Sequence, residues 1–136
     1  MRPPVIHLKA YVATLVLFLG IDALWLGVVA RGFYASQLGG LMREQPNMVA
    51  AGGFYLFYVA GIVFFAVAPA LAAGSWKMAA LNGLLLGLIA YGTYDMTNVA
   101  TLKGWPVTMS LVDMAWGGAL TAASAAGGYA IARALS

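Results

Sequence analysis

Three aspartates, Asp22, Asp95 and Asp113, lie inside stretches of the chain that are otherwise almost entirely apolar. Charged residues make up only 8% of the sequence, and hydrophobic residues make up 63%. A carboxylate in the hydrocarbon of a bilayer costs about 2.5–3.5 kcal/mol even on the milder insertion scale, and such residues usually mark a ligand site or a pathway. These side chains are therefore the first candidates for a working site. The alternative is that they only join helices through hydrogen bonds.

The composition excludes several kinds of chemistry. Cysteine is absent, so disulfides, thiolate nucleophiles and cysteine metal sites are excluded. His7 is the only histidine, so neither a metal site nor a haem or other cofactor is expected. The net charge of +3 comes from scattered basic residues, and nucleic acid is not an expected partner. No Ser-His pair, HExxH motif or phosphate loop assigns a catalytic residue, and the sequence leaves open whether the protein is an enzyme.

The apolar stretches predict an all-α integral membrane protein, folded as a four-helix transmembrane bundle. A spanning helix needs about 20 apolar residues. The 136 residues are expected to form a single transmembrane domain with spans at approximately 8–33, 48–73, 78–102 and 106–134. Asn47 is the expected N-cap of the second span, and Pro69 should kink that span or end its regular part. The connection 31–46 is expected to contain a short interfacial helix.

The first apolar run and the basic residues predict how the chain enters the membrane. The run extends from Ala10 to Ala30, which is longer than the core of a signal peptide, so we interpret it as a retained span. The N-terminal side of the four spans carries Arg2, Lys9, Lys77 and Arg133, and the far side carries Arg31, Arg43 and Lys103. By the positive-inside rule, both termini are expected in the cytoplasm.

The rise of a helix predicts that the three acids lie in the half of the bundle farther from the N-terminus. With a rise of about 1.5 Å per residue, Asp22 lies about 16 Å from the far side, and Asp95 and Asp113 lie about 10 Å from it. Tyr91, Asp95 and Asn98 follow one helical face of the third span. The candidate ligand-binding or proton-binding residues are Asp22, Asp95, Asn98, Asp113, Trp25, Trp116, Tyr91, Tyr94, Thr97, Thr101 and Lys103. Pairing of Asp95 with Lys103 near the far side is the structural alternative for that acid.

Asp22 and Asp113 are each followed three residues later by a tryptophan, Trp25 and Trp116. This spacing puts each indole beside its acid on a helix. Because the first and fourth spans run in opposite directions, Trp25 should lie level with Asp113 and Trp116 level with Asp22. An indole N–H only donates and a carboxylate only accepts. We therefore predict cross-pairing, Trp25 to Asp113 and Trp116 to Asp22.

Small residues predict where helices approach closely. Gly83 and Gly87 form a GxxxG motif in the third span. The fourth span carries a small residue at every fourth position, at Ala115, Ala119, Ala123 and Gly127. Such ridges favour close packing of helix backbones. Packing within one subunit is the expected use, and homodimerisation is the alternative.

An acid-lined pocket with aromatic walls suits more than one function. The leading hypothesis is a small membrane protein that binds an amphipathic or cationic ligand through ion pairs and cation–π contacts. Buried carboxyls also suit reversible proton binding, so proton-coupled transport belongs to this hypothesis. One alternative is a membrane enzyme, or an accessory subunit of one, that acts on lipids or lipophilic molecules, because two acids can serve as acid and base. Another is a structural partner protein. The bilayer is a partner in every case.

The segment Tyr94-Asp95-Met96-Thr97-Asn98-Val99-Ala100-Thr101-Leu102-Lys103-Gly104-Trp105-Pro106 carries a specific signature. Together with the two D-x-x-W segments, it resembles an uncharacterised family of small bacterial inner-membrane proteins, domain of unknown function 2177, over essentially the whole chain. The resemblance implies about four spans and no known activity. It also supports a set of site candidates without giving them roles: Asp22, Asp95, Thr97, Asn98, Thr101, Lys103, Trp105, Asp113 and Trp116.

Overall fold

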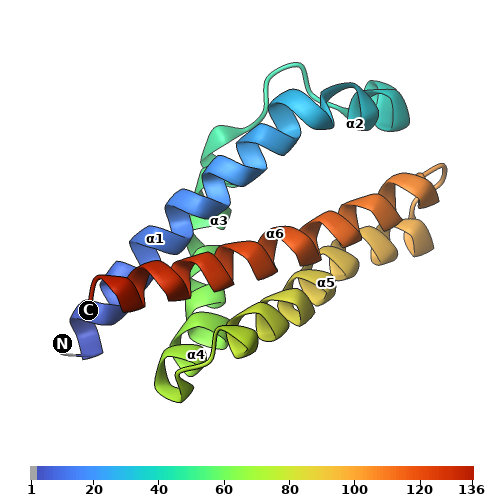
Figure 1. Cartoon of the computed structure of the whole chain (residues 1–136). Coiled ribbons are helices and arrows are strands. Elements are labelled where there is room, and N and C mark those ends of the chain that lie inside the picture. Colours follow the sequence, from blue (N-terminus) through green and yellow to red (C-terminus); the bar gives the residue numbers. More distant parts are fainter. Residues whose placement is uncertain (1–2) are drawn as a thin grey trace.

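The computed structural model describes residues 3–136, with side chains from Val5 onward. Arg2, which entered the charge comparison, lies outside the described residues. Within them the chain forms helices and no strand, which confirms the all-α class. In chain order these are α1 (Pro3–Leu24), η1 (Trp25–Val29), α2 (Arg31–Leu38), η2 (Gly39–Leu41), α3 (Met48–Ile62), η3 (Val63–Val67), α4 (Ala68–Ala73), α5 (Trp76–Thr101) and α6 (Val107–Ala134) (Figure 1).

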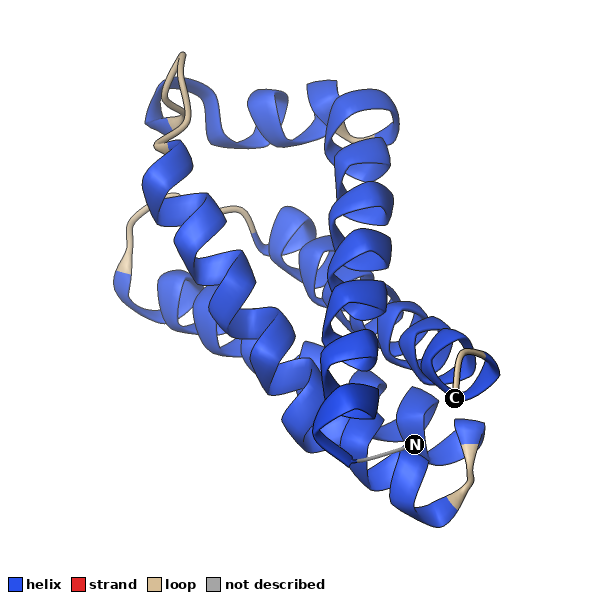
Figure 2. Cartoon of the chain, turned by 90° about the vertical axis from the view of Figure 1, so that its left-hand side faces the viewer, coloured by secondary structure: helices blue, strands red, loops and turns tan. Residues whose placement is uncertain are grey.

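The first helix ends earlier than the expected segment 8–33. α1 continues into the π-helical turn η1, where the amide of Ala30 donates to the carbonyl of Trp25 at 2.7 Å. Ala30 then leaves helical geometry, with φ −109° and ψ 7°. The chain turns there, and α2 lies across the upper end of the bundle in Figure 2. A short helix in the 31–46 connection is therefore confirmed, and it carries Tyr34 back toward α6.

Local signals explain the second helical segment. The side chain of Asn47 accepts a hydrogen bond from the amide of Ala50 at 3.1 Å, so the predicted N-cap is confirmed. Pro69 has no amide hydrogen and cannot donate to the carbonyl of Phe65 four residues earlier. The π-helical turn η3 lies at this point, and Asn82 of α5 donates to the Phe65 carbonyl at 3.2 Å. A side chain from the neighbouring helix thus replaces the bond that proline removes.

α5 and α6 lie antiparallel and side by side along most of their lengths in Figure 1. They approach closely at Gly87, where an added Cβ would lie 2.2 Å from the carbonyl oxygen of Gly117. At Gly83 an added Cβ would lie 2.9 Å from the carbonyl oxygen of Thr121. The GxxxG motif therefore packs helices within the chain, as expected. The small-residue ridge of α6 is mostly not used for packing within the chain: Ala115, Ala119 and Ala123 are exposed, and Gly127 is half-buried, where an added Cβ would lie 2.5 Å from the side chain of Leu17.

Two helical segments are long and apolar enough to cross a membrane, Val5–Val29 and Met48–Ala73. Only 17% and 33% of their most apolar windows are buried inside the molecule. Their outward faces are strongly apolar, since Phe57 is 74% exposed and Phe64 is 70% exposed. An exposed apolar face of this kind is typical of a surface that meets lipid or a partner. α5 and α6, with 26 and 28 residues, are long enough to span but less apolar.

Candidate functional site

Asp22 of α1 and Trp116 of α6 are joined across the bundle. The indole Nε1 of Trp116 donates to Oδ1 of Asp22 at 3.1 Å, and Asp22 is 5% exposed. This half of the predicted cross-pairing is confirmed. It follows from two facts, the three-residue spacing between acid and tryptophan and the opposite directions of α1 and α6. A buried carboxylate is thereby given a donor from a neighbouring helix.

The other half of the cross-pairing is wrong as a direct contact. The indole of Trp25 donates to the hydroxyl of Tyr34 at 3.1 Å, and that hydroxyl donates to Oδ1 of Asp113 at 2.8 Å. Tyr34 comes between the predicted partners because the chain turns at Ala30 and α2 folds over α6. Burial raises the pKa of the Tyr34 phenol above its ordinary value, so the group stays protonated and remains a donor.

The two indoles stack on each other. The ring centroids of Trp25 and Trp116 lie 4.3 Å apart, with 9° between the ring planes. A continuous chain of contacts therefore runs from Asp22 through Trp116, Trp25 and Tyr34 to Asp113. Offset or stacked aromatic pairs stabilise by about 0.5–1.5 kcal/mol beyond the area that they bury. This stack therefore holds the first and last helices, and their acids, in one arrangement.

Asp95 of α5 differs from the other two acids. It is fully buried, and neither carboxylate oxygen has a hydrogen-bond partner within residues 3–136. Its carboxyl lies beside that of Asp113. A buried charge without a partner is strongly unfavourable, and two adjacent carboxylates repel. The fold itself supplies no hydrogen-bond donor to the Asp95 carboxyl, which sets this acid apart from Asp22 and Asp113.

Tyrosines from α3 and α5 surround the acids. Tyr55 lies close to Asp22, and the Tyr58 hydroxyl shares a hydrogen bond of 2.9 Å with Thr121. The rings of Tyr58 and Tyr91 pack edge to face, with centroids 6.3 Å apart. Tyr91 was predicted from the sequence as a site residue, whereas Tyr55 and Tyr58 were not. Their i, i+3 spacing, among phenylalanines that face outward, is a signal that could have identified them.

Two cavities meet at Asp113 and Tyr94. The first, of about 370 Å³, lies between α3, α5 and α6, and Tyr55, Tyr58 and Tyr91 line it together with these two residues. The second, of about 390 Å³, lies beneath α2, where Arg31 and Tyr34 are part of its lining. Both volumes are at the lower end for small-molecule sites. Asp113 is thus accessible from two cavities, whereas Asp22 lines neither of them.

Several sequence candidates lie outside these cavities. Thr97 and Thr101 are exposed, and their hydroxyls donate to carbonyls of their own helix. Lys103 is exposed beyond the end of α5, whereas Asp95 is buried, so the two do not pair. Asn98 is half-buried one turn beyond Asp95 and lines neither cavity.

Trp105 lines neither of the two cavities, but it contacts Ser110 and Tyr94. Its indole donates to the Ser110 hydroxyl at 2.9 Å, and its ring packs edge to face on Tyr94 with centroids 5.7 Å apart. Ser110 in turn donates to the carbonyl of Pro106 at 2.8 Å. Trp105 therefore ties the start of α6 to Tyr94, and so helps to hold Tyr94 between the two cavities.

No group of three or more metal-binding side chains occurs within residues 3–136.

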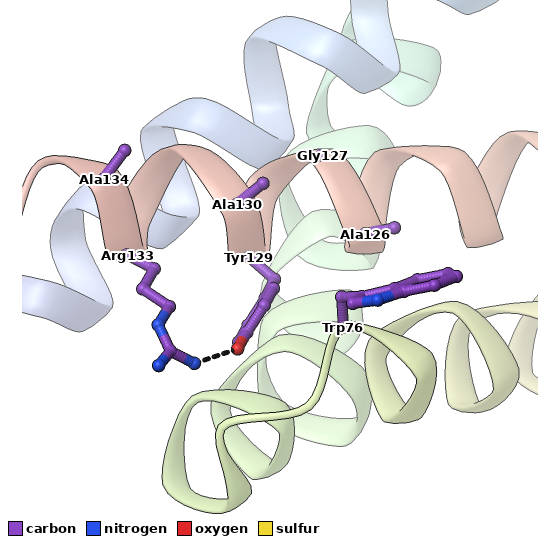
Figure 3. Close-up of a pocket in the computed structure, with 7 residues that line it drawn as sticks. All are labelled: Trp76, Ala126, Gly127, Tyr129, Ala130, Arg133 and Ala134. Atoms are coloured by element: carbon purple, nitrogen blue, oxygen red, sulfur yellow. Dashed lines mark hydrogen bonds between the residues drawn. The ribbon is translucent and has the colours of Figure 1, made fainter.

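A larger cavity, of about 740 Å³, lies at the opposite end of α6 (Figure 3). Trp76, Tyr129 and Arg133 are among its lining residues, and Arg133 donates to the Tyr129 hydroxyl. The remaining lining residues are alanines and a glycine. Arg133 is twenty residues from Asp113 on one helix, which corresponds to about 30 Å. This cavity is separate from the acids and contains no acid of its own.

The family model that matches the chain is described as "Predicted membrane protein (DUF2177)", and the match covers residues 7–130. No curated protein and no solved structure matches the chain.

Proposed function

We propose, given that the chain belongs to the DUF2177 family of predicted membrane proteins, that it crosses the bacterial inner membrane four times as one helical bundle. α5 and α6 exceed the length of about 20 residues that a span needs. Their lower hydropathy has a physical reason. Their glycines, Asp95 and Ser124 face the interior, where they pack against other helices rather than lipid.

Both termini are proposed to lie in the cytoplasm. At their end of the bundle, Lys9 donates to the carbonyl of Leu135 at 2.8 Å, which holds the two ends of the chain together. Because the chain has no cysteine, single cysteines can report topology directly. A cysteine at Gly40 should react with an impermeant maleimide added to intact spheroplasts, and one at Ser136 should react only after permeabilisation. The reverse pattern would show the opposite orientation.

The function that the site supports best is binding of a small amphipathic or cationic ligand between the helices, with proton movement coupled to it. One observation carries this proposal. Asp95 is fully buried without a hydrogen-bond partner within residues 3–136, beside Asp113, which lines two cavities. A cation bound at Asp113 in either cavity balances the charge of the pair, although Asp95 itself lines neither cavity, and the aromatic side chains of the lining favour a cation with an apolar body. When the cation leaves, a proton can take its place.

Tetraphenylphosphonium is a suitable probe for this proposal. The measurement is the tryptophan fluorescence of protein in nanodiscs, in a Trp76→Phe background that removes the indole of the distant cavity. Three tryptophans remain, and binding should quench Trp25 and Trp116 through their contacts toward Asp113 and Trp105 through its contact with Tyr94. Asp113→Asn should weaken the affinity at least about tenfold, since it removes a charge from a poorly solvated site. Glu44→Gln, the same change at an exposed acid outside both cavities, is the matched control.

Proteoliposomes test the coupled proton movement. The probe should drive a change of internal pH that Asp113→Asn abolishes and Glu44→Gln leaves intact. Absence of binding in the wild-type protein, or equal binding by the two variants, would remove the basis of the proposal. Binding without proton movement would reduce it to a binding protein.

One observation favours a second candidate, an enzyme or accessory subunit that acts on lipids. Asp95 and Asp113 are adjacent carboxyls in different surroundings, and such pairs can divide the roles of acid and base. This candidate predicts a changed lipid profile in a strain that overexpresses the protein. Asp113→Asn should cancel the change while the protein accumulates normally. A structural partner protein would tolerate that substitution and copurify with a stoichiometric companion.

A further inference from the structure

The cavity beneath α2 is lined by charges of both signs. Arg31 and Asp113 are the charged residues of its lining, and Leu26, Leu38, Met42 and Met109 supply half of the remaining lining residues. A site for a simple lipophilic cation needs an acid and an apolar wall, and it gains nothing from a guanidinium. The presence of Arg31 therefore calls for a ligand that carries a negative group as well as a positive one.

The two charges are kept apart in the structure. Arg31 is exposed at the start of α2, and Asp113 takes its hydrogen bond from Tyr34 rather than from Arg31. A guanidinium is well suited to two-point binding of a phosphate or carboxylate. Because Asp113 already has another donor, Arg31 remains available to a ligand at the mouth of the cavity.

The acid end of the cavity requires hydrogen-bond donors. One oxygen of Asp113, the acid that lines the cavity, accepts from Tyr34; Asp95 lies beside Asp113, lines neither cavity, and has neither oxygen partnered within residues 3–136. A primary ammonium supplies three N–H donors together with its charge. A quaternary ammonium supplies charge alone and donates no hydrogen bond to Asp113. Asp113 therefore favours a primary over a quaternary ammonium.

We infer that this cavity binds a zwitterion in which an anionic group lies at Arg31 and a primary ammonium lies at Asp113. A phosphoethanolamine group has this chemistry, either on a phospholipid or as a free molecule. The inference rests on the proposed function, and it names the ligand class of the same acids. The apolar lining from Leu26, Leu38 and Met42 fits the glycerol and acyl carbons of a lipid better than it fits water.

The experiment uses the full chain with Trp76→Phe, in nanodiscs of phosphatidylglycerol, with tryptophan fluorescence as the readout. Phosphatidylethanolamine and phosphatidylcholine are titrated in separate series, free phosphoethanolamine in a third and tetraphenylphosphonium in a fourth. Phosphatidylethanolamine should bind about tenfold more tightly than phosphatidylcholine. Arg31→Gln should weaken phosphatidylethanolamine about tenfold and leave tetraphenylphosphonium unchanged. Arg31→Lys should give an intermediate affinity, because lysine keeps the charge but not the two-point geometry.

Arg43→Gln is the matched control, since Arg43 is an exposed arginine of the same connection that lines neither cavity. It should alter none of the affinities. Equal affinity for the two lipids, or no effect of Arg31→Gln on the affinity for phosphatidylethanolamine, would overturn the inference of a zwitterionic ligand. The proposed function would still stand in that case if tetraphenylphosphonium binds. Failure of both probes would overturn both. If free phosphoethanolamine binds as tightly as the lipid, the zwitterion stands and its source is a soluble molecule.

Discussion

Replacement of Tyr34 by phenylalanine tests the hydrogen-bonded bridge that links η1 and α2 to α6. The substitution removes one hydroxyl and two hydrogen bonds, from Trp25 at 3.1 Å and to Asp113 at 2.8 Å. A hydrogen bond to a charged group stabilises by about 1.5–3 kcal/mol, and those between membrane helices average about 0.6 kcal/mol. Since Tyr34 is half-buried at the end of the bundle, we expect a loss of about 2 kcal/mol in the free energy of unfolding.

The assay is reversible unfolding in mixed micelles, with Tyr11→Phe as the control. Tyr11 is also half-buried, but its hydroxyl donates only to the backbone carbonyl of Leu56, at 2.9 Å. Its loss should cost about 0.6 kcal/mol. Because the pKa of Tyr34 is raised, its contribution should persist at every pH below the ordinary phenol value and fall only at higher pH.

A double-mutant cycle separates the bridge from general damage. Tyr34→Phe combined with Asp113→Leu should show a coupling of about 1 kcal/mol or more, because each single change already breaks the same bond. Tyr11→Phe combined with Asp113→Leu should be additive within about 0.5 kcal/mol. If Tyr34→Phe costs no more than Tyr11→Phe and its cycle is additive, the bridge between the helices does not exist and the reasoning fails.

Two further predictions concern the packing that holds the site. Gly87→Ala should destabilise the protein by about 1–3 kcal/mol, since the new methyl would lie 2.2 Å from a carbonyl oxygen of α6; Gly20→Ala, which meets no atom within 4 Å, should be neutral or slightly stabilising in the same unfolding assay. Asn82→Ala should cost about 1–2 kcal/mol by leaving the Phe65 carbonyl without a donor. Pro69→Ala restores a backbone donor to that carbonyl, so Asn82→Ala should cost clearly less in the Pro69→Ala background, and equal costs would contradict the proposed exchange of donors.

The contact between Asp22 and Trp116 could be predicted because it depends on local rules alone. Three-residue spacing fixes which indole lies beside which acid, and antiparallel helices fix which pairs lie level. The close packing at both GxxxG glycines could be predicted in the same way, because the spacing of the two glycines along one helix is enough to indicate it. In the structure a Cβ at either position would meet the backbone of α6. Neither result requires knowledge of how the connections fold.

The role of Tyr34 could not be predicted for the opposite reason. The depth estimate assumed a regular helix to Phe33, whereas the helix ends at Ala30 after a π-helical turn. Gly27 lies within that turn and Gly32 follows it, but glycine is frequent inside membrane helices, so neither residue signals the turn by itself. The alternative pairing of Lys103 with Asp95 fails for a similar reason. α5 ends at Thr101, so Lys103 lies beyond the end of the helix that carries Asp95.

The three acids are not equivalent, and the difference bears on function more than their number does. Asp22 has its indole donor and lines neither cavity, so a structural role accounts for it, whereas Asp113 has its phenol donor on one oxygen and also lines both cavities. Asp95 has neither oxygen partnered within residues 3–136 and opposes folding. Asp95→Leu should therefore raise the free energy of unfolding, since it replaces a buried carboxyl with a side chain that needs no partner. The same variant should lose the tetraphenylphosphonium affinity. A protein that becomes more stable as it loses its ligand maintains that acid for the ligand, whereas a variant that loses stability would assign Asp95 to the fold.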